Sequence, residues 1–335
     1  MSAEKREFRM DFVQRIISFD EKSRTFKAVL DPDPQRYEWK EISGERCLYD
    51  KLDKLYIPEQ VYAAAIRELS ERIREKGVSL ELYKIDDVEP YIKTLPPRIA
   101  QILDGTGPPL PNFQDKSEAF LDSLINDMLD FVIVSLDVKG STKLSIGVEP
   151  ESYARLMGAF LYALSEVIPR FSGHVLKYTG DGLIAYFSEP CFIRKNDFAV
   201  NCVYKLHQLT YEVLNPLFEK RGFPVLDIRI GLDAGQAYVM AIGSPQTKRH
   251  ADIIGKVVNL AAKIQAQAGP GEICLGDTVQ RNLHTALRRI CEPVRLGKEW
   301  DYRNLSGDVY EIHRLRLDKK WPTSPNMVFT FHSHE

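Results

Sequence analysis

Residues 131–142 read FVIVSLDVKGST, an apolar run that ends in Asp137 and is followed by a Gly-Ser-Thr stretch. A run of β-branched and aromatic residues bounded by turn residues predicts a buried strand. Asp137 is therefore expected at the C-terminal end of this strand. An aspartate in such a position is often only a helix N-cap or turn residue, so its meaning depends on what accompanies it.

A second acidic residue accompanies another predicted strand. Residues 176–187 read LKYTGDGLIAYF, which places Asp181 in a glycine-flanked hairpin turn ahead of an apolar run. Two carboxylates on neighbouring strands can hold a pair of divalent cations over a triphosphate. The two motifs together predict a metal site for phosphoryl chemistry.

A third motif lies downstream. Residues 252–263 read DIIGKVVNLAAK, a strand-like stretch that passes through Gly255 into a helical pattern. Asn259 and Lys263 are four residues apart and share one face of the expected helix. The small apolar residues of this helix are expected to face a hydrophobic core.

These motifs resemble, in order and spacing, those of the class III adenylate and guanylate cyclases. The matching segments are residues 131–144, 176–187 and 228–264, and the resemblance extends over roughly residues 128–315. It implies an enzyme that makes a 3′,5′-cyclic nucleotide and pyrophosphate from a nucleoside triphosphate. Two divalent cations, Mg²⁺ or Mn²⁺, would assist the attack of the ribose 3′-hydroxyl on the α-phosphate.

The resemblance assigns roles to the metal-binding and base-binding residues. Asp137 and Asp181 match the metal-binding aspartates, and Val138 matches a position whose backbone carbonyl also contacts metal. Lys177 and Asp252 match the pair that reads the base in adenylate cyclases.

The remaining roles depart in part from the family pattern. Asn259 matches the residue that orients the ribose, and Lys298 is the candidate for the lysine that grips the terminal phosphates. Lys263 stands where the family usually has an arginine that stabilises the transition state. It keeps the positive charge but lacks the planar guanidinium that can bind phosphate through two hydrogen bonds. Gln236 stands where some relatives have a phosphate-contacting arginine.

The base choice follows from hydrogen-bonding edges. Lys177 offers only donors and ionised Asp252 only acceptors, which fits adenine or cytosine and rejects guanine and uracil. The pair does not separate ATP from CTP, and ATP is preferred modestly. Some relatives are stand-alone bacterial pyrimidine cyclases that signal phage infection. A cytidylate cyclase, or less readily a uridylate cyclase, therefore stays open as the alternative.

The resemblance also bears on assembly, because in this family the active site lies between two catalytic domains. One domain supplies the metal aspartates and the other the base-reading and transition-state residues. This chain carries both sets once, so a head-to-tail homodimer with two equivalent sites is expected. A non-catalytic nucleotide-binding module remains a competing interpretation, and the downstream effector is not indicated.

The chain divides into four predicted parts. These are an N-terminal region of unknown role (1–105), a linker with a lead-in helix at 117–129 (106–129), the cyclase domain (130–316) and a tail (317–335). Helices are predicted over 150–168 and 195–214. The alternation of elements predicts an α/β sandwich with a mixed sheet. The resemblance implies a largely antiparallel sheet with flanking helices and a ferredoxin-like core.

The bulk composition is that of an ordinary globular protein. Of 335 residues, 44% are hydrophobic and 27% charged, and the net charge of −2 argues against general nucleic-acid binding. No apolar run reaches the roughly 18 residues of a membrane span, and no signal sequence is recognisable, so a cytoplasmic location is expected. The five scattered cysteines argue against a zinc site or a disulfide framework.

Overall fold

The computed structural model describes residues 10–20, 25–76, 88–107, 116–188, 192–244, 246, 249–304 and 307–321. These residues form two compact units. The first unit contains the described residues of 1–83 together with 284–288, and the second contains those of 84–283 and 289–321. The expected start of the catalytic domain at residue 130 stays a prediction.

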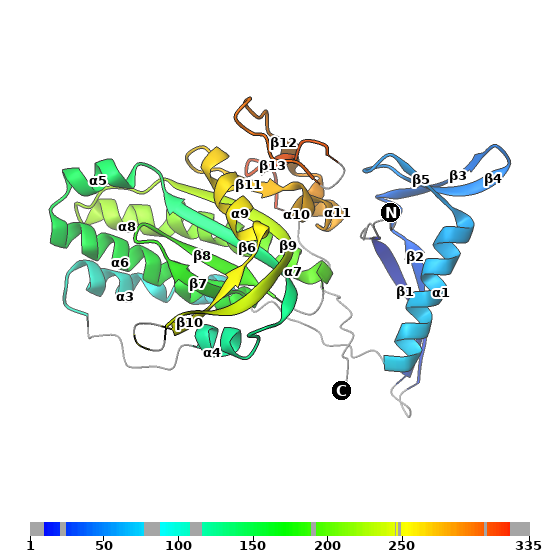
Figure 1. Ribbon diagram of the computed structural model, residues 1–335, viewed down its shortest axis with the longest axis horizontal. Coiled ribbons are helices and arrows are strands. Elements are labelled where there is room, and N and C mark those ends of the chain that lie inside the picture. Colours follow the sequence, from blue (N-terminus) through cyan, green and yellow to red (C-terminus); the bar gives the residue numbers. More distant parts are fainter. Residues whose placement is uncertain are drawn as a thin grey trace. The chain divides into compact units, whose positions relative to one another are not determined.

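The first unit consists of two small antiparallel sheets and two helices (Figure 1). Its elements are β1 (Phe12–Asp20), β2 (Thr25–Pro32), β3 (Tyr37–Ile42), β4 (Glu45–Asp50), β5 (Leu55–Pro58), α1 (Glu59–Lys76) and α11 (Thr285–Arg288).

A buried ion-pair network joins the segments of the first unit. The guanidinium of Arg36, which is 1% exposed, donates to Asp50 at 2.9 and 2.7 Å and to Asp53 at 2.8 Å. Arg288 of α11 donates to the other oxygen of Asp53 at 2.6 Å. Because breaking a buried ion pair leaves an uncompensated charge, this network fixes α11 within the unit.

The second unit is built on an eight-stranded sheet with the order β12-β13-β11-β9-β6-β8-β7, in which β10 also pairs with β9. Among the strand pairs in the described part of the chain, only β9–β11 is parallel. This confirms the predicted mixed, largely antiparallel sheet. The strands are β6 (Met128–Val138), β7 (His174–Tyr178), β8 (Gly182–Phe187), β9 (Ile228–Gly243), β10 (Arg249–Ile254), β11 (Ile273–Gly276), β12 (Cys291–Pro293) and β13 (Ile312–Leu315).

Helices cover both faces of this sheet. Those of the second unit are α2 (Val88–Ile92), α3 (Leu95–Leu103), α4 (Lys116–Asp122), α5 (Ser141–Gly147), α6 (Pro150–Val167), α7 (Phe192–Gln208), α8 (Asn215–Lys220), α9 (Lys256–Gln267) and α10 (Asp277–Arg281). The helices predicted at 150–168 and 195–214 are confirmed, the second as α7 continued by a π-helix over Leu209–Leu214.

The central strand β6 is buried on both sides. Phe131 and Ile133 belong to the hydrophobic cluster that includes Val257 and Ala261 of α9. Val132, which lies between them, points to the opposite face, since side chains alternate along a strand. It is also fully buried, and helix α7 contacts β6 as well. Figure 1 shows α9 lying across β6 and β9. Burial on both faces explains why the strand reads as a continuous apolar run.

The predicted lead-in helix over 117–129 is wrong in its second half. The helix α4 ends at Asp122, and Met128 already belongs to β6. Asn126 has a positive φ of 77°, and its amide donates to the carbonyl of Val239 at 2.8 Å. Residues 126 and 127 therefore join the edge of the β9 strand, because pairing with that backbone competes with continuation of the helix.

Gly182 is required by the close approach of two strands. It lies opposite Asp137 in the β6–β8 pairing, and a Cβ there would stand 2.0 Å from the carbonyl oxygen of Leu136. Gly182→Ala is expected to reduce the free energy of unfolding by about 3 kcal/mol, since the strand must shift to admit the methyl group. Urea-induced unfolding measures this.

The matched control for that change is Gly158→Ala, within α6. No atom lies within 4 Å of a Cβ built there. Alanine is expected to raise stability by up to about 1 kcal/mol, because it favours a helix interior more than glycine does. Equal effects of the two substitutions would contradict the steric argument.

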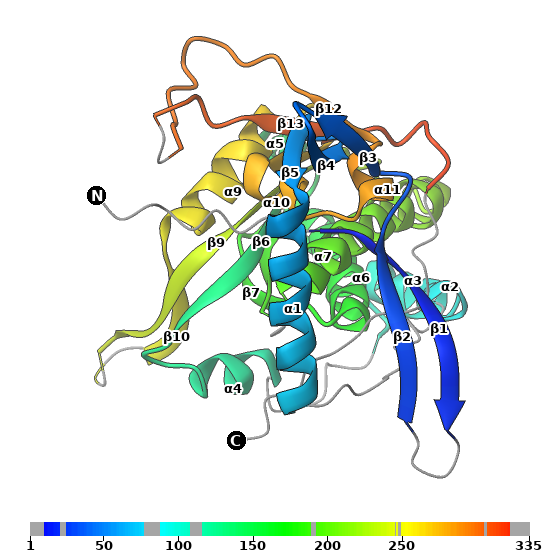
Figure 2. The ribbon, with the colours of Figure 1, turned by 90° about the vertical axis from the view of Figure 1, so that its right-hand side faces the viewer.

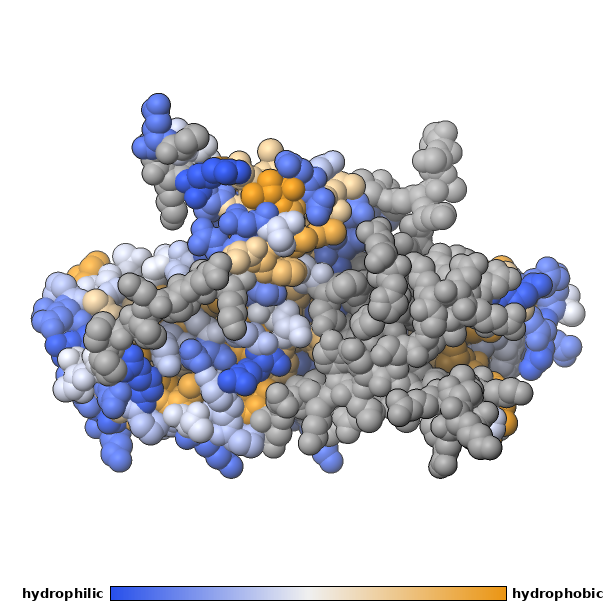
Figure 3. Space-filling view, turned by 90° about the horizontal axis from the view of Figure 1, so that it is seen from below, coloured by the Kyte–Doolittle hydropathy of each residue, from blue (hydrophilic) through white to orange (hydrophobic). Residues whose placement is uncertain are grey.

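Among the described helices, none combines the length and apolarity that crossing a bilayer requires. On the face drawn in Figure 3, hydrophobic side chains of the described residues occur in small groups among hydrophilic ones. Most of the predicted linker at 106–111 and most of the tail, residues 322–335, lie outside the described residues. Within the described part, Trp321 stacks on Tyr204 of α7 with ring centroids 3.6 Å apart.

Candidate functional site

The structure brings the two predicted metal-binding aspartates together at the ends of two neighbouring strands. Asp137 ends β6 one residue before Val138, and Asp181 lies in the turn between β7 and β8. The pairing of β6 with β8 places Asp137 opposite Gly182, directly after Asp181. The amide of Val138 donates to the carbonyl of Asp181 at 3.1 Å. Both strand ends are thus held side by side by backbone hydrogen bonds.

Arg229 engages both carboxylate oxygens of Asp137. Its Nε donates to Oδ1 at 3.0 Å and its Nη2 donates to Oδ2 at 2.6 Å. Arg229 is the direct cross-strand partner of Asp137 in the β6–β9 pairing. Arg229 is not singled out by the sequence alone, because its proximity to Asp137 depends on strand register.

Asp181 has a different environment from Asp137. The hydroxyl of Ser141, the first residue of α5, donates to Oδ2 of Asp181. A hydroxyl donor leaves the carboxylate charge uncompensated, whereas a guanidinium neutralises it. The two aspartates are therefore electrostatically unequal.

The donor set suits a hard divalent cation. Carboxylates from two adjoining strand ends and a nearby backbone carbonyl supply only oxygen ligands, which Mg²⁺ and Mn²⁺ prefer. Within the described ranges, no group of three or more His, Cys, Asp or Glu could hold a metal by itself.

The predicted base-reading pair also meets in the structure. The ammonium of Lys177, on β7, donates to Oδ2 of Asp252, on β10, at 2.7 Å. The carboxylate side chain is 11% exposed and the lysine side chain 42% exposed. Helix α4 contacts both β7 and β10, and Figures 1 and 2 show it alongside β10. The pair is therefore held between elements 75 residues apart in the chain.

Two further contacts orient Asp252. The amide of Ile253 donates to its Oδ1 at 2.9 Å, and the Nε2 atom of His250 lies 3.9 Å from its Oδ2. His250 also lines a hollow of about 350 Å³ together with Asp122 of α4 and Arg249. Sequence reasoning missed His250, although its position two residues before Asp252 on one strand was a usable signal.

The other predicted site residues are exposed. Asn259 and Lys263 lie on the outer face of α9, and Lys298 lies in the segment that follows β12. Their side chains are thus available to a ligand or to a second copy of the chain.

A buried carboxylate lies beneath the helix that carries Asn259 and Lys263. Asp233, on β9, is 2% exposed and accepts a hydrogen bond from the Tyr310 hydroxyl. Burial raises the pKa of Asp233 to about 7, the negative charge of Asp277 adds to the rise, and the Tyr310 hydrogen bond opposes it. The neutral acid is therefore favoured in the folded chain well above the ordinary pKa of aspartate.

Asp233 should make stability depend on pH. Its folded pKa exceeds its unfolded value near 4, so the folded state holds one more proton between about pH 4 and 7, and stability falls as pH rises through this window. Asp233→Asn is expected to be more stable than the wild type at pH 8 by a few kcal/mol, and this advantage should shrink toward pH 5. Urea-induced unfolding at the two pH values measures it; an advantage that grows on acidification would contradict the argument.

Comparison with known families gives a match over the segment that carries most of these residues. The profile described as Adenylate and Guanylate cyclase catalytic domain matches residues 127–298, just over half of the chain. The described fold is also found in solved structures. The adenylyl cyclase CyaB from P. aeruginosa is similar with a TM-score of 0.50 at 21% identity, over 56% of this chain and 94% of that one.

Curated relatives carry several substrate names. A cytidylate cyclase from Staphylococcus aureus is 26% identical over 157 residues, which are 44% of this chain and 36% of that protein. A uridylate cyclase from Burkholderia cepacia is 26% identical over 147 residues, which are 43% of this chain and 62% of that protein. The match thus spans about a third of the cytidylate cyclase's length.

Proposed function

Because the chain belongs to the adenylate and guanylate cyclase catalytic domain family, we propose that it converts a nucleoside triphosphate into a 3′,5′-cyclic nucleotide and pyrophosphate. The observation that carries this proposal is the juxtaposition of Asp137 and Asp181 at the ends of two neighbouring strands. Two carboxylates at such a place attract divalent cations, and the cations can bind a triphosphate.

The metal-binding half-site consists of Asp137, Asp181 and the carbonyl of Val138. These residues would hold two divalent cations, Mg²⁺ or Mn²⁺. When bound, the cations supply Lewis-acid activation of the ribose 3′-hydroxyl and neutralise charge on the phosphates. The Ser141 hydroxyl keeps the Asp181 carboxylate in place from the start of α5.

The second half-site consists of residues that hold the nucleotide. Asn259 orients the ribose, Lys263 donates to the phosphoryl oxygens as negative charge develops there, and Lys298 grips the terminal phosphates. A lysine ammonium is a point charge without the bidentate fork of arginine. All three side chains are exposed in the single chain, so nothing in the described residues prevents their contact with substrate.

The complete site requires a second copy of the chain, arranged head to tail. An apolar surface of Met128, Tyr238, Met240 and Ile254 supports this assembly. These side chains are 46–51% exposed, and Tyr238 lies opposite both Met128 and Ile254 in the strand pairings. Because Asp252 lies opposite Met240 in the same pairing, a partner seated on this surface would lie next to the base-reading pair.

The base is adenine or cytosine. Lys177 would present donors to a ring nitrogen acceptor and Asp252 acceptors to an exocyclic amino group. Their 2.7 Å contact supports this proposal, because it shows that the two side chains can reach the same base edge. The family description names adenylate together with guanylate cyclases, so it is compatible with ATP, and the cytidylate cyclase relative supports CTP. A cytidylate cyclase that signals phage infection to an effector is therefore the second candidate. Either nucleotide would be available to a cytoplasmic protein.

The test is incubation of the purified protein with each of the four ribonucleoside triphosphates, with Mg²⁺ or Mn²⁺, and mass analysis of the products. Cyclic AMP or cyclic CMP with pyrophosphate is expected. Cyclic GMP or cyclic UMP would contradict the reading of Lys177 and Asp252. Nucleotide binding without any product would show a non-catalytic module instead.

A further inference from the structure

Arg229 forms an ion pair with Asp137, the carboxylate that the proposed function assigns to metal binding. Its side chain is 17% exposed and that of Asp137 is 23% exposed, so the ion pair is largely screened from solvent. Both oxygens of Asp137 are engaged, at 3.0 and 2.6 Å. A two-point contact between a planar guanidinium and a carboxylate fixes the plane of the carboxylate.

The contact leaves room for cations. An ionised carboxylate has about four lone-pair positions on its two oxygens. The guanidinium uses one on each oxygen, so one on each oxygen remains. A carboxylate held in this way can still accept a divalent cation at the positions that the guanidinium leaves open.

We infer that Arg229 is a positioning residue that fixes the plane of the Asp137 carboxylate in the orientation in which it would bind a divalent cation. This inference rests on the metal site of the proposed function and adds a residue to it. The geometry that supports it is the direct pairing of Asp137 with Arg229 across β6 and β9. A backbone-defined register keeps the guanidinium in place before any cation arrives.

A simple electrostatic role would have the opposite consequence. A cationic guanidinium next to Asp137 repels a metal ion, so a residue that only repels should strengthen metal binding when it is removed. A positioning residue should weaken binding when it is removed, because partners of metal ligands typically contribute 10–100-fold to metal affinity. The sign of the effect therefore separates the two roles.

The experiment titrates Mn²⁺ into the nucleotide-free full chain and follows the free ion by electron paramagnetic resonance. Arg229→Lys keeps the positive charge but loses the planar guanidinium that makes the two-point contact. Arg229→Gln loses the positive charge but keeps an amide group that can donate a hydrogen bond. Both variants are expected to bind Mn²⁺ roughly tenfold more weakly than the wild type. Unchanged binding by Arg229→Lys, or tighter binding by Arg229→Gln, would overturn the inference.

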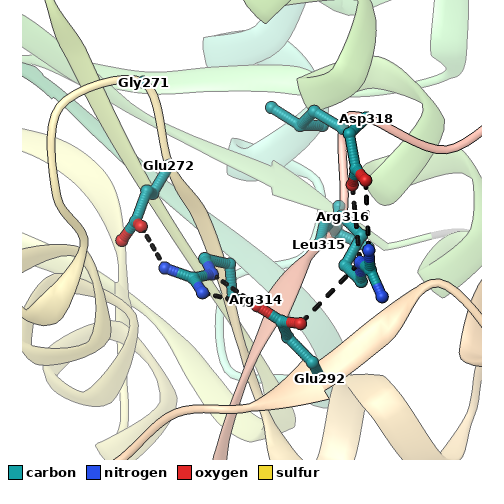
Figure 4. Close-up of a pocket in the computed structure, with 8 residues that line it drawn as sticks. Gly271, Glu272, Glu292, Arg314, Leu315, Arg316 and Asp318 are labelled. Atoms are coloured by element: carbon teal, nitrogen blue, oxygen red, sulfur yellow. Dashed lines mark hydrogen bonds and ion pairs between the residues drawn. The ribbon is translucent and has the colours of Figure 1, made fainter.

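The matched control is Arg314→Lys on β13. Arg314 is also a strand arginine between carboxylates: it donates to Glu272 and, through Nε at 3.0 Å, to Glu292. Figure 4 shows its guanidinium between these two side chains. Arg314→Lys is expected to leave Mn²⁺ binding unchanged; weakening equal to that of Arg229→Lys would show a general effect on the sheet and would overturn the inference.

Asp137→Asn separates the inference from the proposed function. It should abolish the Mn²⁺ binding seen in the wild type. If it does not, the proposed metal site is wrong, and the proposed role of Arg229 is wrong as well. If Asp137→Asn abolishes binding while both Arg229 variants bind as the wild type does, only the role of Arg229 is wrong.

Discussion

Equal amounts of the Asp137→Asn and Asn259→Ala variants are expected to regain about a quarter of the wild-type cyclase activity when they are mixed. Each variant alone should lose about a thousandfold or more, because a metal ligand or a group at the reacting ribose contributes several kcal/mol to the transition state. The reason for recovery is that the two residues belong to complementary halves of a site shared between two copies.

The arithmetic follows from two-fold symmetry. Random pairing makes about half of the dimers mixed, and each mixed dimer contains one complete site and one doubly defective site. About a quarter of all sites are then intact. The measurement is product formation after mixing, with dimer formation checked by size-exclusion chromatography.

A matched mixture provides the control. Asp137→Asn and Asp181→Asn remove ligands from the same half-site, so no mixed dimer contains a complete set and no recovery is expected. Recovery in this control, or none in the Asp137–Asn259 mixture despite confirmed dimers, would contradict the shared site.

The second large effect is a change of base preference. Exchange of the pair, Lys177→Glu with Asp252→Lys, keeps an ion pair but reverses the donors and acceptors offered to the base. A site built to hydrogen-bond one edge can reject the wrong edge by about 10⁴-fold. The double variant is expected to lose ATP and CTP turnover by at least about a hundredfold and to favour GTP or UTP.

The measurement compares kcat/KM for the four nucleotides in the wild type and the double variant. Single Lys177→Glu should lose activity with every base, because it places two carboxylates together where the wild type has a 2.7 Å ion pair.

An exchange elsewhere tests whether the change in base preference is specific to the site. Glu151 and Arg155, an exposed pair on α6, can be exchanged in the same way, and this exchange should leave all four kcat/KM values unchanged. Unaltered base preference in the Lys177–Asp252 exchange would show that these residues do not read the base.

Local patterns were sufficient for the single elements. The apolar run before Asp137 indicated β6, the glycine-flanked Asp181 indicated the hairpin turn, and the sequence from Asp252 to Lys263 indicated a strand that leads into α9. Each signal depends on the periodicity of adjacent residues, which sequence records directly. The one helix that was drawn too long, over 117–129, ends where Asn126 hydrogen-bonds to β9, a partner far away in the chain.

The charged residues at strand ends, and the elements that carry them, can be read from local stretches of the sequence. Which of these residues meet depends on the folded chain. Asp137 faces Arg229 because of the β6–β9 register, and Lys177 reaches Asp252 because α4 and the paired strands bring β7 and β10 together. The physical reason is that a shift of one residue in register turns every side chain of a strand to the other face. Register is set by packing across the whole sheet, which no local stretch of sequence contains.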